Sequence, residues 1–158
     1  MKWVLKSPKR FLQERDDLDA LAKDVDWVEA LHWRMDGEFA VQVDIDLRVH
    51  GKVYSATLTY PEFFPHTPGF VFPRDRSEIW SQHQYGAGGA LCLEWRADNW
   101  NTSVTGADLI RSTYKLLHTE HNPEVPASVQ SAHSVTRGQE LRSKNHRFVV
   151  TPELRAFF

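Results

Sequence analysis

The fold class of this chain is indicated most clearly by one segment, Val41-Gln42-Val43-Asp44-Ile45-Asp46-Leu47-Arg48-Val49. Apolar and polar side chains alternate along it without a break, which is the pattern of a β-strand with one buried face. Asp36-Gly37 before the stretch and His50-Gly51 after it are residue pairs that tight hairpin turns prefer. We therefore predict strands at 27–34 and 52–60 on either side, joined with the central strand as an antiparallel meander.

Beyond the meander, the apolar run Phe70-Val71-Phe72 follows a proline-rich stretch and is the predicted fourth strand. From 73 to 105 no hydrophobic period is sustained, so this region is predicted to be a long ordered loop, which is usually functional in a compact domain. The chain shows no linker, repeat or low-complexity tract. Residues 1–158 are therefore interpreted as a single α+β domain, with helices packed on one sheet.

Helices are predicted before and after the sheet. Ser7 precedes a proline at a first helical position, and helical spacing of apolar residues continues to about Asp24. Thr105 and Asp108 form a capping-box pattern at the start of a helix that should stop near Asn122-Pro123. Further helices are expected after Pro126. The side chains expected to face the core are Phe11, Leu18, Ala22 and Val25, then Leu109, Ile110, Thr113, Leu116 and Leu117, then Val129, Ala132, Val135, Leu141 and Phe148.

The charge balance argues against nucleic acid and membranes as partners. The chain has 19 Lys and Arg residues against 21 Asp and Glu residues, a net charge of -2. It therefore lacks the basic excess that binding to phosphates or anionic lipids requires. Its apolar runs are far shorter than the roughly 20 residues of a membrane-spanning helix, and its start lacks the apolar stretch of a signal peptide. We expect a cytoplasmic protein, whose one cysteine is a free thiol.

That cysteine, Cys92, lies in the long loop between two leucines and follows the glycine-rich stretch Gly86-Ala87-Gly88-Gly89. Glycines let the backbone approach closely, so an accessible nucleophile with nearby amides is one interpretation. Composition alone favours the other interpretation, a small buried hydrophobic residue. His83, earlier in the loop, could pair with Cys92 in a thiol hydrolase, although proximity in sequence does not establish contact in space.

Two further clusters have both a structural and a functional interpretation. His118 and His121 have a spacing that can bind a metal on a helix, but no third ligand stands out, so no metal or other cofactor is predicted. The prolines of residues 60–69 favour a rigid, packed turn. The alternative for that turn is a docking surface for a partner, formed by exposed Phe63 and Phe64.

Together these motifs resemble the ubiquitin-conjugating (E2) enzyme family. The resemblance runs from roughly Pro8 to Phe148 and rests on motifs in the family's order, namely the pairs Tyr60-Pro61, Phe64-Pro65 and Pro68-Gly69, the active-site segment Leu91-Cys92-Leu93-Glu94, Trp100, Leu116-Leu117, and Asn122-Pro123. It implies the ubiquitin-conjugating (UBC) fold, with an N-terminal helix, a four-stranded antiparallel meander, a long active-site loop and C-terminal helices. Where eukaryotic members carry His-Pro-Asn, this chain reads His83-Gln84-Tyr85-Gly86.

The resemblance implies an acyl transferase in which Cys92 is the nucleophile and forms a thioester. His83 and Gln84 are expected to support the loop or the oxyanion. Glu94 and Asn99 are expected to be polar groups on the acceptor side. Trp100 and Tyr85 are expected to be structural residues near the site, Trp100 because a large aromatic is more often packing than catalyst.

The Tyr-Gly form of the motif is similar to bacterial E2-like proteins, some of which accompany anti-phage cyclic-nucleotide synthases in CBASS-type operons. The implied cargo is the C-terminus of a ubiquitin-like protein or of such a synthase (CD-NTase), with an E1-like activating enzyme as a further partner. An E2-variant binding module, with the same fold and no acyl transfer, is the alternative. The cysteine at the family's active-site position argues against this alternative.

Overall fold

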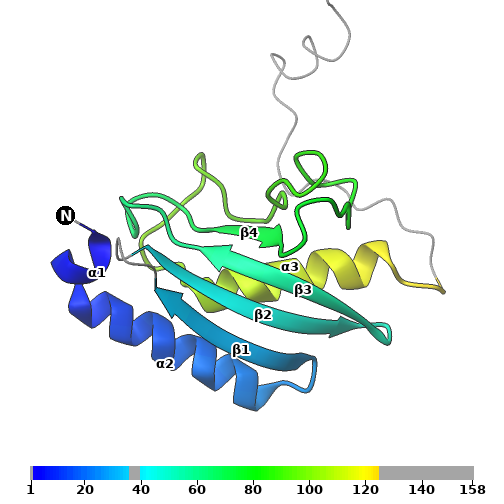
Figure 1. Ribbon diagram of the computed structural model, residues 1–158, viewed down its shortest axis with the longest axis horizontal. Helices are drawn as coiled ribbons and strands as arrows, with labels where there is room; N and C mark the ends of the chain where they lie inside the picture. The colour runs from blue at the N-terminus through cyan, green and yellow to red at the C-terminus, as the bar shows by residue number, and fades with distance from the viewer. Residues whose placement is uncertain (1, 36–39, 125–158) are drawn as a thin grey trace, which may run out of the picture.

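The computed structural model describes residues 2–35 and 40–124 (Figure 1). Two helices come first, four strands follow, and a helix comes after a long loop. The elements are α1 (Trp3–Lys6), α2 (Pro8–Asp24), β1 (Val28–Met35), β2 (Val41–Val49), β3 (Lys52–Thr59), β4 (Phe70–Pro73) and α3 (Gly106–Glu120). In Figure 1 α3 lies behind the sheet, and α2 runs along the side of β1. The predicted α+β architecture is confirmed.

The four strands form one antiparallel sheet in the order β1-β2-β3-β4, so the predicted meander and its fourth strand are confirmed. In β2 the side chains of Val41, Val43, Ile45, Leu47 and Val49 are at most 1% exposed. Strand alternation places all of them on the face that α3 covers. The turn between β2 and β3 has positive φ angles at His50 and Gly51, as a tight two-residue hairpin requires. The predicted turn at Asp36-Gly37 lies outside the described residues.

Both predicted long helices are present. α2 has the predicted bounds, and its buried face carries Leu18 and Leu21. At the start of α3, Asp108 accepts hydrogen bonds from the backbone N–H and the hydroxyl of Thr105, which is the predicted capping interaction. The helices predicted after Pro126 lie outside the described residues.

Ser7 occupies the predicted N-cap position of α2, with a proline directly after it, but the expected capping by its side chain is not found. Its side chain makes no capping hydrogen bond, because a short helix, α1, precedes it. The Ser7 N–H closes that helix by donating to the Trp3 carbonyl, and the Ser7 carbonyl accepts from the N–H of Phe11. Ser7 is therefore a backbone link between two helices. The extra turn places Trp3 and Val4 in the core, a placement that the sequence analysis did not predict.

Candidate active site

Cys92 lies in the long loop between β4 and α3, in a segment whose neighbouring side chains hold it in place. Leu91 and Leu93 are 5% and 4% exposed, whereas Cys92 between them is half-buried. The Leu91 N–H donates to the Val71 carbonyl of β4 over 2.9 Å, and the Cys92 N–H donates to the His83 carbonyl over 2.6 Å. The two leucines therefore anchor the segment in the core, and Cys92 between them is only partly buried. The interpretation of Cys92 as a fully buried hydrophobic residue is wrong.

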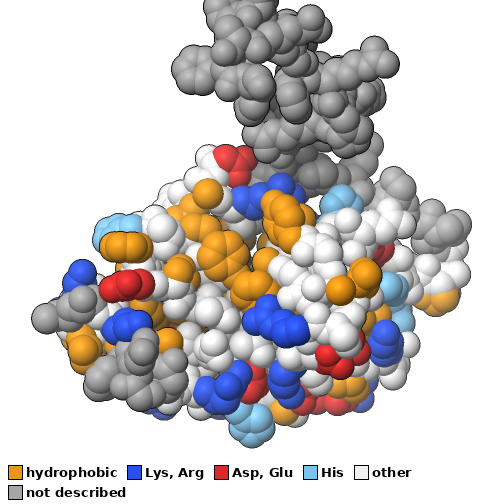
Figure 2. Space-filling view, turned by 45° about the horizontal axis from the view of Figure 1, so that its top comes forward, with side chains coloured by type: hydrophobic (Ala, Val, Ile, Leu, Met, Phe, Trp, Pro, Cys, Tyr) orange, Lys and Arg blue, Asp and Glu red, His pale blue; other side chains and the backbone are white. Residues whose placement is uncertain are grey.

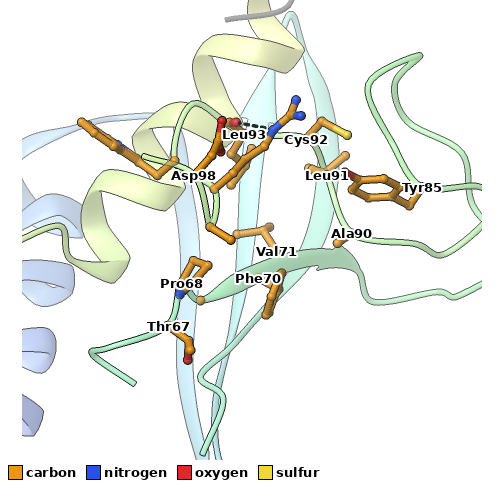
Figure 3. A pocket seen from close by; sticks show the side chains of 14 residues that line it. Thr67, Pro68, Phe70, Val71, Tyr85, Ala90, Leu91, Cys92, Leu93 and Asp98 are labelled. Atoms are coloured by element: carbon orange, nitrogen blue, oxygen red, sulfur yellow. Dashed lines mark hydrogen bonds between the residues drawn. The ribbon is translucent and has the colours of Figure 1, made fainter. Parts of the chain in front are cut away.

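A groove of about 560 Å³ lies between the Cys92 segment and the start of β4. Figure 3 shows Cys92, Leu93 and Asp98 along one side of it, with Thr67 and Pro68 on the opposite side. Apolar side chains gather on this face of the molecule in Figure 2. The lining residues that the sequence analysis did not assign to the site include Phe70, Val71, Trp95, Arg96 and Asp98. The groove is formed mainly by apolar side chains, with one cation and one anion among them.

The glycine-rich stretch before Cys92, residues 86–89, makes contacts that need glycine. Gly88 has φ +63°, and a Cβ there would lie 2.0 Å from the Arg76 carbonyl oxygen. The Gly88 N–H donates to the Glu78 carbonyl, and the Arg76 guanidinium donates to the Gly88 carbonyl over 2.9 Å. The glycine-rich stretch therefore packs closely against residues 76–78. This packing fixes the path of the chain into the Cys92 segment.

The side chain of Gln84 belongs to this loop support. Its Oε1 accepts from the Trp80 N–H over 2.8 Å, and its Nε2 donates to the Glu78 carbonyl over 3.0 Å. These two bonds give Gln84 the expected role in supporting the loop, and because Nε2 carries a second N–H, its role in oxyanion support stays a prediction. Tyr85 next to it is 68% exposed and lines the groove. Tyr85 therefore lies near Cys92 as expected, with its side chain exposed, and its structural role stays a prediction.

The turn after Cys92, residues 94–99, is held together by the side chain of Asn99. Its Oδ1 accepts from the Arg96 N–H over 2.7 Å, and its Nδ2 donates to the Glu94 carbonyl over 2.8 Å. These two bonds make Asn99 a support of the turn, and its expected acceptor-side role stays a prediction. The Glu94 N–H donates to the Ser112 hydroxyl of α3, while the Glu94 side chain is exposed. The acceptor-side role of Glu94 stays a prediction.

Trp100 connects the turn after Cys92 to the proline-rich turn of residues 60–69. Its indole Nε1 donates to the Pro65 carbonyl over 2.7 Å, and its ring lies 6.1 Å from the ring of Phe64 between centroids. Phe64 is 2% exposed in the core, so the expectation that it is an exposed docking residue is wrong. The rigid packed turn holds its ring inside. Phe63 is 66% exposed, and its role in docking stays a prediction.

Replacing Trp100 by Phe is expected to lower the free energy of unfolding by about 0.5–1.5 kcal/mol, because it removes the hydrogen bond to Pro65 and keeps an aromatic ring in place. Urea unfolding measures this difference. Trp95→Phe is the matched control, since it also shortens a half-buried tryptophan, and its indole has no hydrogen bond to any residue that the structure describes. Equal losses for the two variants would show that the Pro65 hydrogen bond contributes nothing.

A buried carboxylate ties the far end of the loop to α2. Glu14 is 0% exposed, and its Oε2 accepts from the Tyr60 hydroxyl over 2.8 Å and from the Gly106 N–H over 2.6 Å. Its Oε1 accepts from Arg10 over 2.7 Å. The same guanidinium donates to the carbonyls of Thr102 and Val104. Burial raises the pKa of Glu14, and the hydrogen bonds from Gly106 and Tyr60 and the charge of Arg10 offset this only in part.

The histidines that the structure describes do not form a metal centre. Among residues 2–35 and 40–124, no group of at least three His, Cys, Asp or Glu side chains could hold a metal ion. The His121 ring nitrogen Nε2 lies 2.7 Å from the Trp80 carbonyl, and the His118 carbonyl is hydrogen-bonded to the ring of His50. His83 is joined to Cys92 through its backbone carbonyl. A catalytic role for the His83 side chain stays a prediction.

Comparisons with known proteins find the likeness in the fold. No protein-family model and no curated protein sequence matches the chain. A ubiquitin conjugating enzyme E2 of Plasmodium vivax is 16% identical, with a TM-score of 0.50 over 66% of this chain and 98% of that chain. The human ubiquitin-conjugating enzyme E2 G1 is 20% identical, with a TM-score of 0.48 over 67% of this chain and 92% of that chain.

The chain thus has the E2 fold, as the sequence motifs predicted. At such low identity the likeness extends to the fold and not to the activity. No helix in the described part of the chain is long and apolar enough to cross a membrane.

Proposed function

We propose that this protein is an E2-like acyl carrier, in which Cys92 accepts the C-terminus of a partner protein as a thioester and passes it to an acceptor. The observation that carries the proposal is the position of Cys92, half-buried between two buried leucines and beside an apolar groove, in the long loop of an E2 fold. Acyl transfer needs an accessible thiol in a fixed position, because the donor has to be held in line with the nucleophile.

The chemistry needs few other groups. Cys92 first gives up its proton, and its thiolate attacks the carbonyl of an activated thioester. A bond forms between that carbon and the Cys92 sulfur, the bond to the donor sulfur breaks, and the donor leaves as a thiolate that takes up the proton. Backbone amides of the loop and the second N–H of Gln84 Nε2 are the candidates for oxyanion support. An acceptor then attacks the Cys92 thioester and releases the thiol.

For the cargo, we propose the C-terminus of a ubiquitin-like protein or of a cyclic-nucleotide synthase, delivered by an E1-like activating enzyme in the cytoplasm of a bacterium. Support for this part comes from the sequence alone, in the form of the His83-Gln84-Tyr85-Gly86 motif and its similarity to anti-phage E2-like proteins. The near balance of charge, with a net charge of -2, favours a protein over a nucleic acid as the partner.

Co-expression of the chain with its neighbouring genes tests the proposal through covalent adducts on gels. We expect an adduct that reducing agent removes in the native chain, an adduct that resists reducing agent in Cys92→Ser, and no adduct in Cys92→Ala. The reason is that a thiol forms a labile thioester, a hydroxyl forms a more stable ester, and a methyl group forms neither. Mass spectrometry of the adduct identifies the cargo.

Absence of any adduct, with an activating enzyme present, would contradict acyl transfer and favour the E2-variant binding module. Turnover of a small activated ester that is lost in His83→Ala would instead indicate a thiol hydrolase. Labelling of Cys92 by iodoacetamide in the folded protein serves as the control for access to the thiol.

A further inference from the structure

The backbone of Cys92 is paired with an earlier part of the same loop. Gln84 and Leu91 form an antiparallel β-bridge, and next to it the Cys92 N–H donates to the His83 carbonyl over 2.6 Å. Paired backbone groups of this kind hold two chain segments in one register. A shift of residues 83–84 therefore moves Cys92 as well.

The chain just before this pairing is bonded to the end of α3. The ring Nε2 of His121, the residue after α3, lies 2.7 Å from the Trp80 carbonyl, and it is the donor because a carbonyl oxygen only accepts. Glu120, the last residue of α3, accepts the Gln82 N–H on its Oε1 over 2.9 Å. Two consecutive side chains thus hold two backbone groups of the loop.

Trp80 connects this attachment to the β-bridge. Its side chain is 4% exposed, and its N–H donates to Oε1 of Gln84 over 2.8 Å. Its ring meets the Tyr54 ring of β3 edge to face, with 5.3 Å between centroids, and the Tyr54 ring also stacks on His121 at 5.6 Å. The hydrogen bonds therefore run from His121 through Trp80 to a residue that is paired with the Cys92 segment.

We propose that Glu120 and His121 are positioning residues, which set the place of the Cys92 thiol through residues 80–84. This inference rests on the proposed function, because the place of the thiol matters for the transfer of an acyl group to it. It goes further by giving the end of α3, which does not line the groove, a role in the rate of that step. Small misplacements of a reacting group lower such rates strongly.

Acylation of Cys92 by the thioester of acetyl-Ala-Ala-Gly with mercaptoethanesulfonate tests His121, with intact mass spectrometry as the readout. We expect His121→Asn to load about tenfold more slowly than the native chain, because its shorter amide does not reach the Trp80 carbonyl. His121→Gln should restore most of the rate, since its Nε2 is as many bonds from Cβ as the ring Nε2. Equal loading by the native chain and His121→Asn, or by the two variants, would overturn the inference.

A second histidine at the same end of α3 supplies the matched control. The His50 ring Nε2 lies 2.8 Å from the His118 carbonyl, so it joins the turn between β2 and β3 to α3 by the same kind of bond. The φ angle of His50 is +47°, a conformation that asparagine tolerates. His50→Asn should therefore lose a similar contact and keep its loading rate. Equal slowing by His50→Asn and His121→Asn would assign the effect to the stability of α3 and overturn the inference.

The same assay tests Glu120 with two variants. Glu120→Ala removes the acceptor of the Gln82 N–H and is expected to slow loading, whereas Glu120→Gln keeps an acceptor oxygen and should load at close to the native rate. Both variants remove the charge, so their difference reports the hydrogen bond. Equal losses in the two variants would contradict the positioning role of Glu120.

Amide hydrogen exchange separates this inference from the proposed function. The Cys92 N–H is bonded to the His83 carbonyl, so its exchange reports the pairing without an acyl donor. We expect exchange about two- to tenfold faster in His121→Asn, the factor for the net contribution of one hydrogen bond, and no change in His50→Asn. Faster exchange in a chain that accepts no acyl group would support the link from α3 to Cys92 and contradict acyl transfer. Loading by the native chain, with loading and exchange unchanged in His121→Asn, would support acyl transfer and contradict the positioning role.

Discussion

Glu14→Ala is expected to lower the free energy of unfolding by about 3–5 kcal/mol, the cost of removing one partner from a buried ion pair. The carboxylate is 0% exposed and satisfies Arg10, the Tyr60 hydroxyl and the Gly106 N–H together. Truncation leaves these three donors without their acceptor in the core. Urea unfolding measures the loss. A change below about 1 kcal/mol would contradict this account, because an unsatisfied buried group alone costs that much.

Glu14→Gln is the matched variant, since it keeps an acceptor oxygen and removes the charge. It is expected to cost less than Glu14→Ala and to change how stability depends on pH. Burial raises the pKa of Glu14 in the folded protein above its ordinary value of 4.5. Between these two pKa values the folded state binds more protons than the unfolded state, so the contribution of Glu14 is full below the unfolded pKa and is lost as pH rises through the folded pKa.

The difference in stability between the native chain and Glu14→Gln should therefore favour the native chain most in acid and shrink as pH rises above about 4.5. Unfolding measured across this range in both proteins checks the sign. A difference that grows in favour of the native chain as pH rises would show that the attraction to Arg10 outweighs the burial of the carboxylate.

The elements that the sequence predicted well are those whose signal is local. The alternation in β2 arises within a single strand that has one buried face. The start of α3 is marked by Thr105 and Asp108 in one helical turn, so both elements could be predicted from neighbouring residues. The end of α2 and the hairpin at His50-Gly51 are signals of the same kind. The side-chain capping by Ser7 was mispredicted for a related reason. Its local pattern suits a cap, but the turn of helix before it depends on the burial of Trp3 in the core.

The site was harder to predict because its contacts join distant parts of the chain. The groove exists only because residues 90–98 lie beside the start of β4, which the sequence pattern does not encode. Glu14 lies between Phe11 and Leu18 at the spacing of one helical face, and this charged residue in an apolar stripe was the available signal. Its partners Tyr60 and Gly106 come from other elements. A sequence pattern could indicate burial of Glu14 but not what satisfies it.

Gly88→Ala is expected to lower acyl loading of Cys92 about tenfold to a hundredfold, the range of losses that follow from small misplacements of a reacting group. The left-handed backbone of Gly88, with φ +63°, disfavours a side chain by about 1–2 kcal/mol. The Cβ would also lie 2.0 Å from the Arg76 carbonyl oxygen, a backbone atom that cannot turn aside. Relief of this clash requires the glycine-rich stretch to move away from residues 76–78. Loading by a peptide thioester, measured by intact mass, reports the result.

Gly86→Ala separates the clash from the backbone preference. Gly86 has φ +69°, close to that of Gly88, but a Cβ there would meet nothing within 4 Å. This variant should therefore lose the same conformational free energy, about 1–2 kcal/mol, and keep its loading rate. Equal loading by the two variants would contradict the view that the contact of Gly88 with Arg76 positions Cys92. A selective loss in Gly88→Ala, at a stability similar to that of Gly86→Ala, would place the effect in the path of the loop and not in the stability of the domain.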